Sequence, residues 1–207
     1  LVPSSSGAAS ELTFQAFKAK AGMRAISCEG LGPMGFALPH TIGACIASGG
    51  KRTVCIDGDG GFQMNIQELE TIRRLNLPIK FFILNNQGYG SIRNTQRNLM
   101  EGRLVASDSS SGLTLPDTLK VVAAYGLKTA RIENHIEIQK RVSEVLNSSG
   151  PVVCEVMISP DQVTLPKVSS RQKADGSFES CPMENMWPFL SEEELEANMI
   201  IPKHEEL

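Results

Sequence analysis

The chain has 207 residues and a formal net charge of −3, with 41% hydrophobic and 21% charged residues. These values are typical of a globular protein with one large domain and a substantial core. Acidic and basic residues are interspersed and no apolar run reaches the length of a membrane span, so we expect neither nucleic acid nor membrane among the partners. The five cysteines are unevenly spaced without a CxxC pair, which favours reduced thiols and a cytoplasmic location.

The N-terminal stretch is small and polar, and the chain does not begin with methionine. We interpret residues 1–10 as a linker, and the chain as a piece of a longer polypeptide or a processed one. A first helix is predicted over residues 10–21, a short strand over 24–29, and a helix rich in small residues over 36–48.

Gly30, Gly32 and Gly35 form a GxGxxG pattern between that strand and that helix. Because Asp57 ends the next predicted strand, the pattern fits a dinucleotide-binding fold, and an NAD-binding dehydrogenase domain is one interpretation. This interpretation leaves the acidic loop at Asp59, and an asparagine pair further on, without a role.

A strand–helix–strand unit follows. Strands are predicted over residues 53–56 and 79–84, and they flank a helix over 66–75 for which Asn65 is the expected N-cap. Because the crossover between such strands is right-handed, the two strands should be parallel.

The two strands of this unit are followed by polar residues, Asp59 after the first and Asn86 after the second, 27 residues apart. The carboxyl ends of parallel strands share one edge of the sheet, so these side chains should lie close together. Carboxylate, amide and nearby carbonyl oxygens suit Mg²⁺ that is bound alongside phosphates. Gly60 and Gly61 leave backbone N–H groups open to an anion at the start of the helix. The sequence therefore predicts a site for a diphosphate and its metal.

The stretches GDGGFQMNIQELETI and ILNNQGYGSIRNTQ resemble the motif of thiamine diphosphate-dependent enzymes, and are similar to their acetolactate synthase branch. The likeness covers roughly residues 1–160. It implies thiamine diphosphate and Mg²⁺ as cofactors, with Asp59, Asn86 and the Gly88 carbonyl as metal ligands. The cofactor-binding residues that it implies are Gly32, Met34, Gly58, Asp59, Gly60, Gly61, Asn86, Gly88 and Tyr89.

The resemblance also implies individual roles. The Gly32 carbonyl would accept a hydrogen bond from the aminopyrimidine, and Met34 would wedge between the two cofactor rings to impose a bent shape. The chain departs from the family at Gly61, where many relatives carry serine, and at Pro33 and His40, where smaller residues are commoner. We expect His40 to be structural.

Beyond the motif, residues 91–103 should begin a polar helix, and residues 104–112 a loop that is either a lid over the site or a plain surface loop. Strands that alternate with helices predict an α/β fold, a doubly wound parallel sheet with helices on both faces, over residues 11–160. Its remaining helices are predicted over 116–126 and 134–146, and its remaining strands over 128–132 and 151–158.

The last segment, residues 161–207, is rich in turn residues and predicted to be an irregular extension that packs on the domain or on a partner. It holds an apolar cluster: Met183, Met186, Trp187, Phe189 and Leu190.

The resemblance implies the cofactor-binding portion of a transferase or lyase that decarboxylates pyruvate or another 2-oxo acid and ligates the product to a second carbonyl compound. In that family the activating glutamate belongs to a separate pyrimidine-binding domain or subunit, so no catalytic residue is assigned and the chain alone should be inactive. A homodimer or homotetramer is expected. A small subunit of a split 2-oxo-acid decarboxylase is the alternative.

Overall fold

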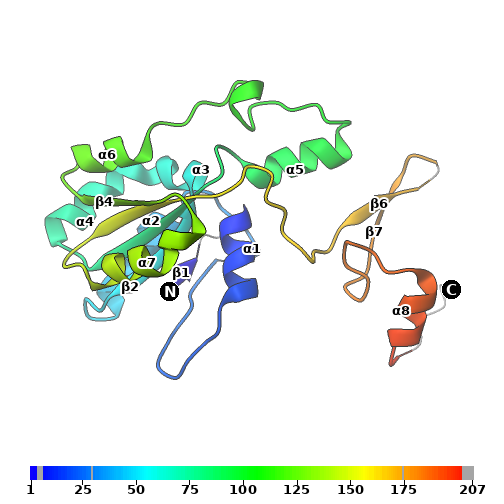
Figure 1. Cartoon of the computed structure of the whole chain (residues 1–207), viewed down its shortest axis with the longest axis horizontal. Helices are drawn as coiled ribbons and strands as arrows, with labels where there is room; N and C mark the ends of the chain where they lie inside the picture. The colour runs from blue at the N-terminus through cyan, green and yellow to red at the C-terminus, as the bar shows by residue number, and fades with distance from the viewer. Residues whose placement is uncertain (4–6, 29, 174, 202–207) are drawn as a thin grey trace. The chain divides into compact units, whose positions relative to one another are not determined.

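The computed structural model describes residues 1–3, 7–28, 30–173 and 175–201. These residues form two compact units, an α/β unit from Leu1 to Gln162 and a C-terminal unit from Val163 to Leu207 (Figure 1).

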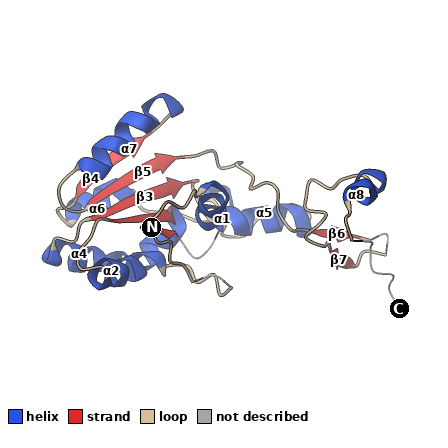
Figure 2. Cartoon of the chain, turned by 90° about the horizontal axis from the view of Figure 1, so that it is seen from below, coloured by secondary structure: helices blue, strands red, loops and turns tan. Residues whose placement is uncertain are grey.

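The α/β unit is organised around one sheet of five parallel strands in the order β1-β2-β3-β5-β4 (Figure 2). Four of these strands are the predicted ones, and the prediction of a parallel α/β sheet is confirmed. The strands are β1 (Val2–Pro3), β2 (Thr53–Gly58), β3 (Ile79–Asn85), β4 (Lys128–Ile132) and β5 (Val152–Met157).

Helices cover both faces of the sheet, as predicted. The larger core lies on one face, where Leu38, Leu69 and Val122 pack against Phe81 and Ile83 of β3. The second core cluster packs α7 over Phe82 and Cys154 on the other face. The helices of the first face are α2 (Ala37–Ala47), α3 (Asp59–Phe62), α4 (Leu69–Leu75) and α6 (Thr118–Ala124); α1 (Gly7–Ala16) and α7 (Ile138–Asn147) lie over the second, and α5 (Gly90–Leu99) follows β3.

The N-terminal segment differs from its prediction. Residues 1–10, predicted to be a linker, contain β1 and the first turn of α1, and α1 ends at Ala16 rather than at residue 21. The strand predicted over residues 24–29 is absent from the described part of that range, since Arg24–Cys28 has no regular structure and Glu29 lies outside the described residues. Its backbone still pairs with Leu1, because the Ile26 N–H donates to the Leu1 carbonyl at 3.1 Å and the Leu1 ammonium donates to the Arg24 carbonyl at 2.8 Å.

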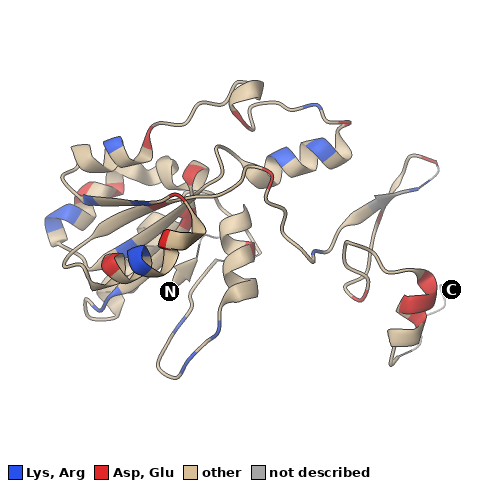
Figure 3. Cartoon of the chain, in the orientation of Figure 1, with Lys and Arg blue, Asp and Glu red and all other residues tan. Residues whose placement is uncertain are grey.

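The C-terminal unit holds an antiparallel hairpin, β6 (Ser170–Gln172) with β7 (Phe178–Ser180), and a short helix, α8 (Glu192–Asn198). Ser191 caps α8 by accepting a hydrogen bond from the Glu194 N–H, and the acidic residues of α8 are red in Figure 3. Trp187 pairs its backbone with Lys167, whose ammonium lies 5.8 Å from the indole ring centroid. Helices of the described residues are all too short or too polar to span a membrane.

Candidate functional site

The candidate site lies where β2 and β3 end. The register of the sheet places Gly58 beside Leu84, so the residues that follow the two strands leave the sheet at the same edge. Asp59 continues directly into α3, and Asn86 opens a turn that leads to α5. The parallel crossover thus brings together the two predicted metal ligands, as expected from their positions after parallel strands.

The helix after β2 begins earlier than predicted, and the expected Asn65 cap is wrong. Helix α3 begins at Asp59, with Gly58 as an extended N-cap, and Asn65 lies at a kink between α3 and α4, with φ −130° and ψ 35°. The Asn65 side-chain amide donates to the Gly35 carbonyl at 2.7 Å. A tertiary contact has replaced the local cap, and it ties the loop at Gly35 to the 3₁₀ segment that follows α3.

Asp59 is the charged centre of the site. It is 5% exposed, and its carboxylate accepts hydrogen bonds from the N–H groups of Gly60 at 2.9 Å and Gly88 at 3.1 Å. Burial raises the pKa of Asp59 to about 6, against the opposing effect of these hydrogen bonds. Within the described ranges no cluster of three or more His, Cys, Asp or Glu side chains is placed to hold a metal. A metal here would therefore draw its other protein ligands from neutral oxygens.

The turn after β3 supplies such oxygens. One terminal atom of the Asn86 side-chain amide lies 2.7 Å from the Gly88 carbonyl oxygen and 3.3 Å from Asp59 Oδ1. With its nitrogen turned that way, the amide donates to both oxygens. With its oxygen turned that way, three oxygens converge, which is the arrangement that a hard cation satisfies. The three predicted metal ligands meet at one point.

The turn has an irregular backbone that depends on glycine. Gln87 has φ 62° and Gly88 has φ 145°. A Cβ atom at Gly88 would lie 2.4 Å from the Ser107 carbonyl oxygen, so no other residue fits without moving one of the two segments.

Residues 104–112, expected as a lid or a surface loop, lie against this turn. The Tyr89 N–H donates to the Ser107 carbonyl at 2.9 Å, and Gly88 forms a β-bridge with Asp108. The Gln96 side chain of α5 donates to the Val105 carbonyl and accepts from the Val105 N–H. The loop is thus fastened to α5 and to the backbone of the Gly88 turn.

Glycines open the other side of the site. A Cβ atom at Gly60 would lie 2.4 Å from the Tyr89 ring, and one at Gly61 would lie 3.0 Å from an Asp57 carboxylate oxygen. Every predicted cofactor-binding residue except Gly32 lines the same small hollow, about 80 Å³ in volume. Met34 reaches this hollow from the GxGxxG loop, whereas Gly32 does not line it.

Two groups of lining or supporting residues escaped the sequence interpretation. The first turn of α1, from Gly7 to Ala9, lines the hollow, and its location was hidden by the small, polar composition that suggested a linker. The other is a chain of contacts from Asn85, whose amide donates to buried Glu155 at 2.7 Å. Glu155 in turn pairs with Arg131 at 2.7 Å. Asn85 therefore faces β5, and its oxygen accepts the Gln87 N–H at 3.0 Å, which fixes the start of the turn.

His40 lies in α2, away from the hollow. Its ring packs on Phe36 with centroids 4.6 Å apart, and its buried Nδ1 has no hydrogen-bond partner within the described structure. Burial lowers the pKa of His40.

The dinucleotide interpretation lacks its structural context. A dinucleotide fingerprint requires that its glycines follow a strand of the sheet, and the residues before Gly30 that the structure describes are not in a strand. The glycine loop instead reaches the site through Met34, beside the Asp59 and Asn86 loops.

Comparisons with known proteins agree with this geometry. The model of the family described as "Thiamine pyrophosphate enzyme, C-terminal TPP binding domain" matches residues 5–156. The chain is 33% identical over 144 residues to the acetolactate synthase large subunit of Cyanidium caldarium, and 38% identical over 144 residues to the probable acetolactate synthase large subunit of Methanococcus aeolicus. It is 37% identical over 133 residues to the acetolactate synthase isozyme 2 large subunit of Escherichia coli (strain K12). These alignments include 70%, 70% and 64% of this chain and 24% of each relative.

Proposed function

The chain belongs to the thiamine pyrophosphate enzymes, as a C-terminal cofactor-binding domain of the acetolactate synthase-like kind, and from this premise we propose that it serves an enzyme that decarboxylates pyruvate and ligates the product to a second carbonyl compound. Thiamine pyrophosphate (thiamine diphosphate) and Mg²⁺ are the cofactors of the family. Because the chain spans about a quarter of the length of the curated relatives it matches, the complete reaction is part of the proposal.

The convergence of the Asp59 carboxylate, the Asn86 side-chain amide and the Gly88 carbonyl carries this proposal. One carboxylate and two neutral oxygens leave octahedral positions open, and Mg²⁺ commonly fills such positions with phosphate oxygens and water. With the Asn86 amide oxygen turned inward, this donor set fits a magnesium ion, which Asp59, Asn86 and the Gly88 carbonyl would hold beside a diphosphate.

The remaining lining residues suit the rest of the cofactor. We propose that the backbone of the loop at Gly58, Gly60 and Gly61, which lines the hollow, holds the diphosphate. Met34 supports the bent cofactor from the opposite loop, and Tyr89 covers Gly60. When bound, the cofactor would supply a nucleophilic carbon for the 2-oxo acid and a cationic ring that accepts the electron pair of decarboxylation. The protein residues bind the cofactor, orient it and exclude water.

The acid that activates the cofactor is assigned to another part of the enzyme. No glutamate is among the described residues that line the hollow. We propose that a pyrimidine-binding domain or subunit supplies it and closes over the site in a homodimer or homotetramer, because such chemistry needs a water-excluded environment. We further propose that the segment 161–207 packs on the α/β unit or on that partner.

A cytoplasmic location is also proposed. All five cysteines are free, and three of them, Cys45, Cys55 and Cys154, are buried. Unpaired thiols of this kind suit a reducing compartment.

The proposal is tested by calorimetric titration of thiamine diphosphate into the full-length protein, with MgCl₂ or with EDTA. We expect binding to require Mg²⁺, and Asp59→Ala to weaken it by more than about 100-fold because the charged ligand is lost. Asp161→Ala is the matched control, since Asp161 is an exposed carboxylate in an ion pair with Arg97. Tight binding that ignores both EDTA and Asp59→Ala would refute the proposed site.

A further inference from the structure

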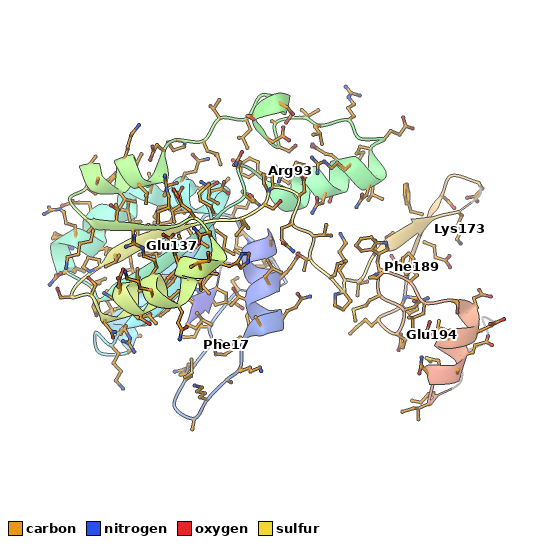
Figure 4. All side chains as sticks on the ribbon, viewed as in Figure 1. Phe17, Arg93, Glu137, Lys173, Phe189 and Glu194 are labelled. Carbon is orange, nitrogen blue, oxygen red and sulfur yellow. The ribbon has the colours of Figure 1, made fainter. Side chains whose placement is uncertain are left out.

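Among the residues that the structure describes, Arg93 is the largest fully buried side chain, with 1% of it exposed, although it lies on an otherwise polar helix. Figure 4 labels it in the first half of α5. Its guanidinium donates to two backbone carbonyls from distant segments, that of Pro160 at 2.5 Å and that of Asn86 at 3.4 Å. The first follows β5, and the second belongs to the turn that carries the metal ligands.

This burial is costly and is not offset by an ion pair. Arg93 forms no salt bridge with any carboxylate in the described residues, and its Nε has no hydrogen-bond partner. A buried cation with an unsatisfied N–H is less favourable than an apolar side chain of similar volume. Packing alone therefore does not account for an arginine at this position.

The contact with Asn86 has a geometric effect on the site. The Asn86 main-chain carbonyl accepts a hydrogen bond from the guanidinium, while the Asn86 side chain faces Asp59 and the Gly88 carbonyl. The turn between them is irregular, with positive φ at both Gln87 and Gly88. Such a backbone persists only where its surroundings hold it, and Arg93 is one of the groups that do so.

The loop over the turn is joined to the same backbone. Asp108 forms the β-bridge with Gly88. The turn that Arg93 contacts through Asn86 is therefore also held by the loop at Asp108.

We propose that Arg93 is a positioning residue for the magnesium site, which holds the Asn86–Gly88 turn in its metal-binding geometry by clamping it to the chain at Pro160. This inference rests on the proposed function. Arg93 touches neither metal nor cofactor in this account; it acts through the Asn86 backbone. Both carbonyls accept from the same guanidinium nitrogen, Nη2, whose two N–H bonds lie in one fixed plane and so set the separation of the carbonyls. The freely rotating ammonium of a lysine does this less well.

The test compares Arg93→Met and Arg93→Lys in the full-length protein with the wild type. Arg97→Met is the matched control, because Arg97 lies one helical turn further along α5 and bonds the neighbouring Asp161, yet is 43% exposed and does not reach Asn86. The half-saturating MgCl₂ concentration for thiamine diphosphate binding is measured by titration, and the turnover of pyruvate is measured at saturating MgCl₂.

We expect Arg93→Met to raise the half-saturating MgCl₂ concentration about tenfold or more, as loss of a group that supports metal ligands does elsewhere. Turnover should largely recover at saturating MgCl₂, Arg93→Lys should restore part of the affinity, and Arg97→Met should match the wild type. Should Arg93→Met fail to fold, Arg93→Lys is the deciding variant. We expect it to raise the half-saturating MgCl₂ concentration about threefold, because lysine holds the two carbonyls less firmly.

An Arg93 variant that folds, as judged by circular dichroism, and keeps the wild-type magnesium dependence overturns the inference. An equal loss of magnesium affinity in the Arg93→Met and Arg97→Met variants also overturns the inference, because the cause would then be the loss of a positive charge on α5. The wild-type protein is titrated first. If its cofactor binding does not depend on magnesium, the proposed function is refuted, and the variants are not needed to show it.

Discussion

A charged side chain is buried at each end of the central sheet, and the two differ in the groups that surround them. At the amino end, Lys80 is 1% exposed and donates to the carbonyls of Ser148 and Gly150, where α7 ends. At the carboxyl end, Asp59 is 5% exposed and faces the Asn86 side-chain amide, which also lies against the Gly88 carbonyl. The cation is paired with two carbonyl acceptors, whereas the anion has two N–H donors and an amide that can turn either its nitrogen or its oxygen toward it.

This difference separates a structural charge from a candidate ligand site. The carbonyls at the C-terminus of a helix favour a cation, so Lys80 is satisfied by the protein itself. Burial of a charge is therefore not by itself a sign of function. The informative feature at Asp59 is that the neighbouring Asn86 amide and Gly88 carbonyl can supply further oxygens to a positive ion, in a hollow lined by glycines.

The largest effect is expected on magnesium affinity, at the carboxyl end of the sheet. Gly88→Ala should reduce the affinity for Mg²⁺ in the presence of thiamine diphosphate by about 100-fold, because its Cβ would lie 2.4 Å from the Ser107 carbonyl oxygen and displace the turn. Gly112→Ala is the control. It too has positive φ, at 95°, but no atom within 4 Å of the added Cβ, so it should cost about 1–2 kcal/mol of stability and leave the magnesium affinity unchanged.

At the amino end of the sheet we expect a smaller effect, on folding stability and not on ligand binding. Lys80→Met should lower the free energy of unfolding by about 1–3 kcal/mol, since it leaves two carbonyls without their donor, and it should not alter cofactor affinity. Lys128→Met removes an exposed ammonium that bonds Ser149 in the same segment, and should cost much less. Urea unfolding and calorimetric titration measure the two quantities. A loss of magnesium affinity in Lys80→Met would break the contrast between the two ends.

The smallest effect concerns a half-buried histidine, His40. Because burial lowers the pKa of His40 below its ordinary value of 6.5, the folded protein resists its protonation, and stability should fall as the pH drops from 6.5 toward the lowered pKa. His40→Gln should reduce the loss of stability between pH 7.5 and 5.5, measured as the shift in the urea midpoint. His135→Gln removes an exposed histidine and should retain the wild-type loss. An identical pH dependence in His40→Gln and the wild type would contradict the expectation.

The sequence predicted the parts of the fold that depend on local pattern. The buried strand at Ile79 and the meeting of Asp59 with Asn86 follow from apolar runs, turn residues and the parallel crossover, and the structure has both. The predicted cofactor and metal roles stay predictions until the titrations are done.

Tertiary contacts explain what the sequence did not reveal. The Asn65 side chain was available to cap a helix, but the Gly35 carbonyl 30 residues earlier is its partner. Val2 and Pro3 form a strand because β2 offers an edge to pair with, and nothing in their composition indicates it. Arg93 reads as a surface residue of a polar helix, and only the arrangement of Asn86 and Pro160 shows why it is buried.

The strand order determines when the strands of the sheet can pair during synthesis of the chain. β5 lies between β3 and β4 although it is the last of the five strands to leave the ribosome, and β4 pairs with no other strand in the described sheet. At about 5–20 residues per second, β2 and β3 can pair several seconds before residues 152–157 emerge. Through that interval the edge of β3 that later pairs with β5 stays open, and β4 is unpaired once it has emerged; such edges are sites for association with other chains. The loops that bear Asp59 and Asn86 can therefore meet on the ribosome while the sheet beneath them is still open.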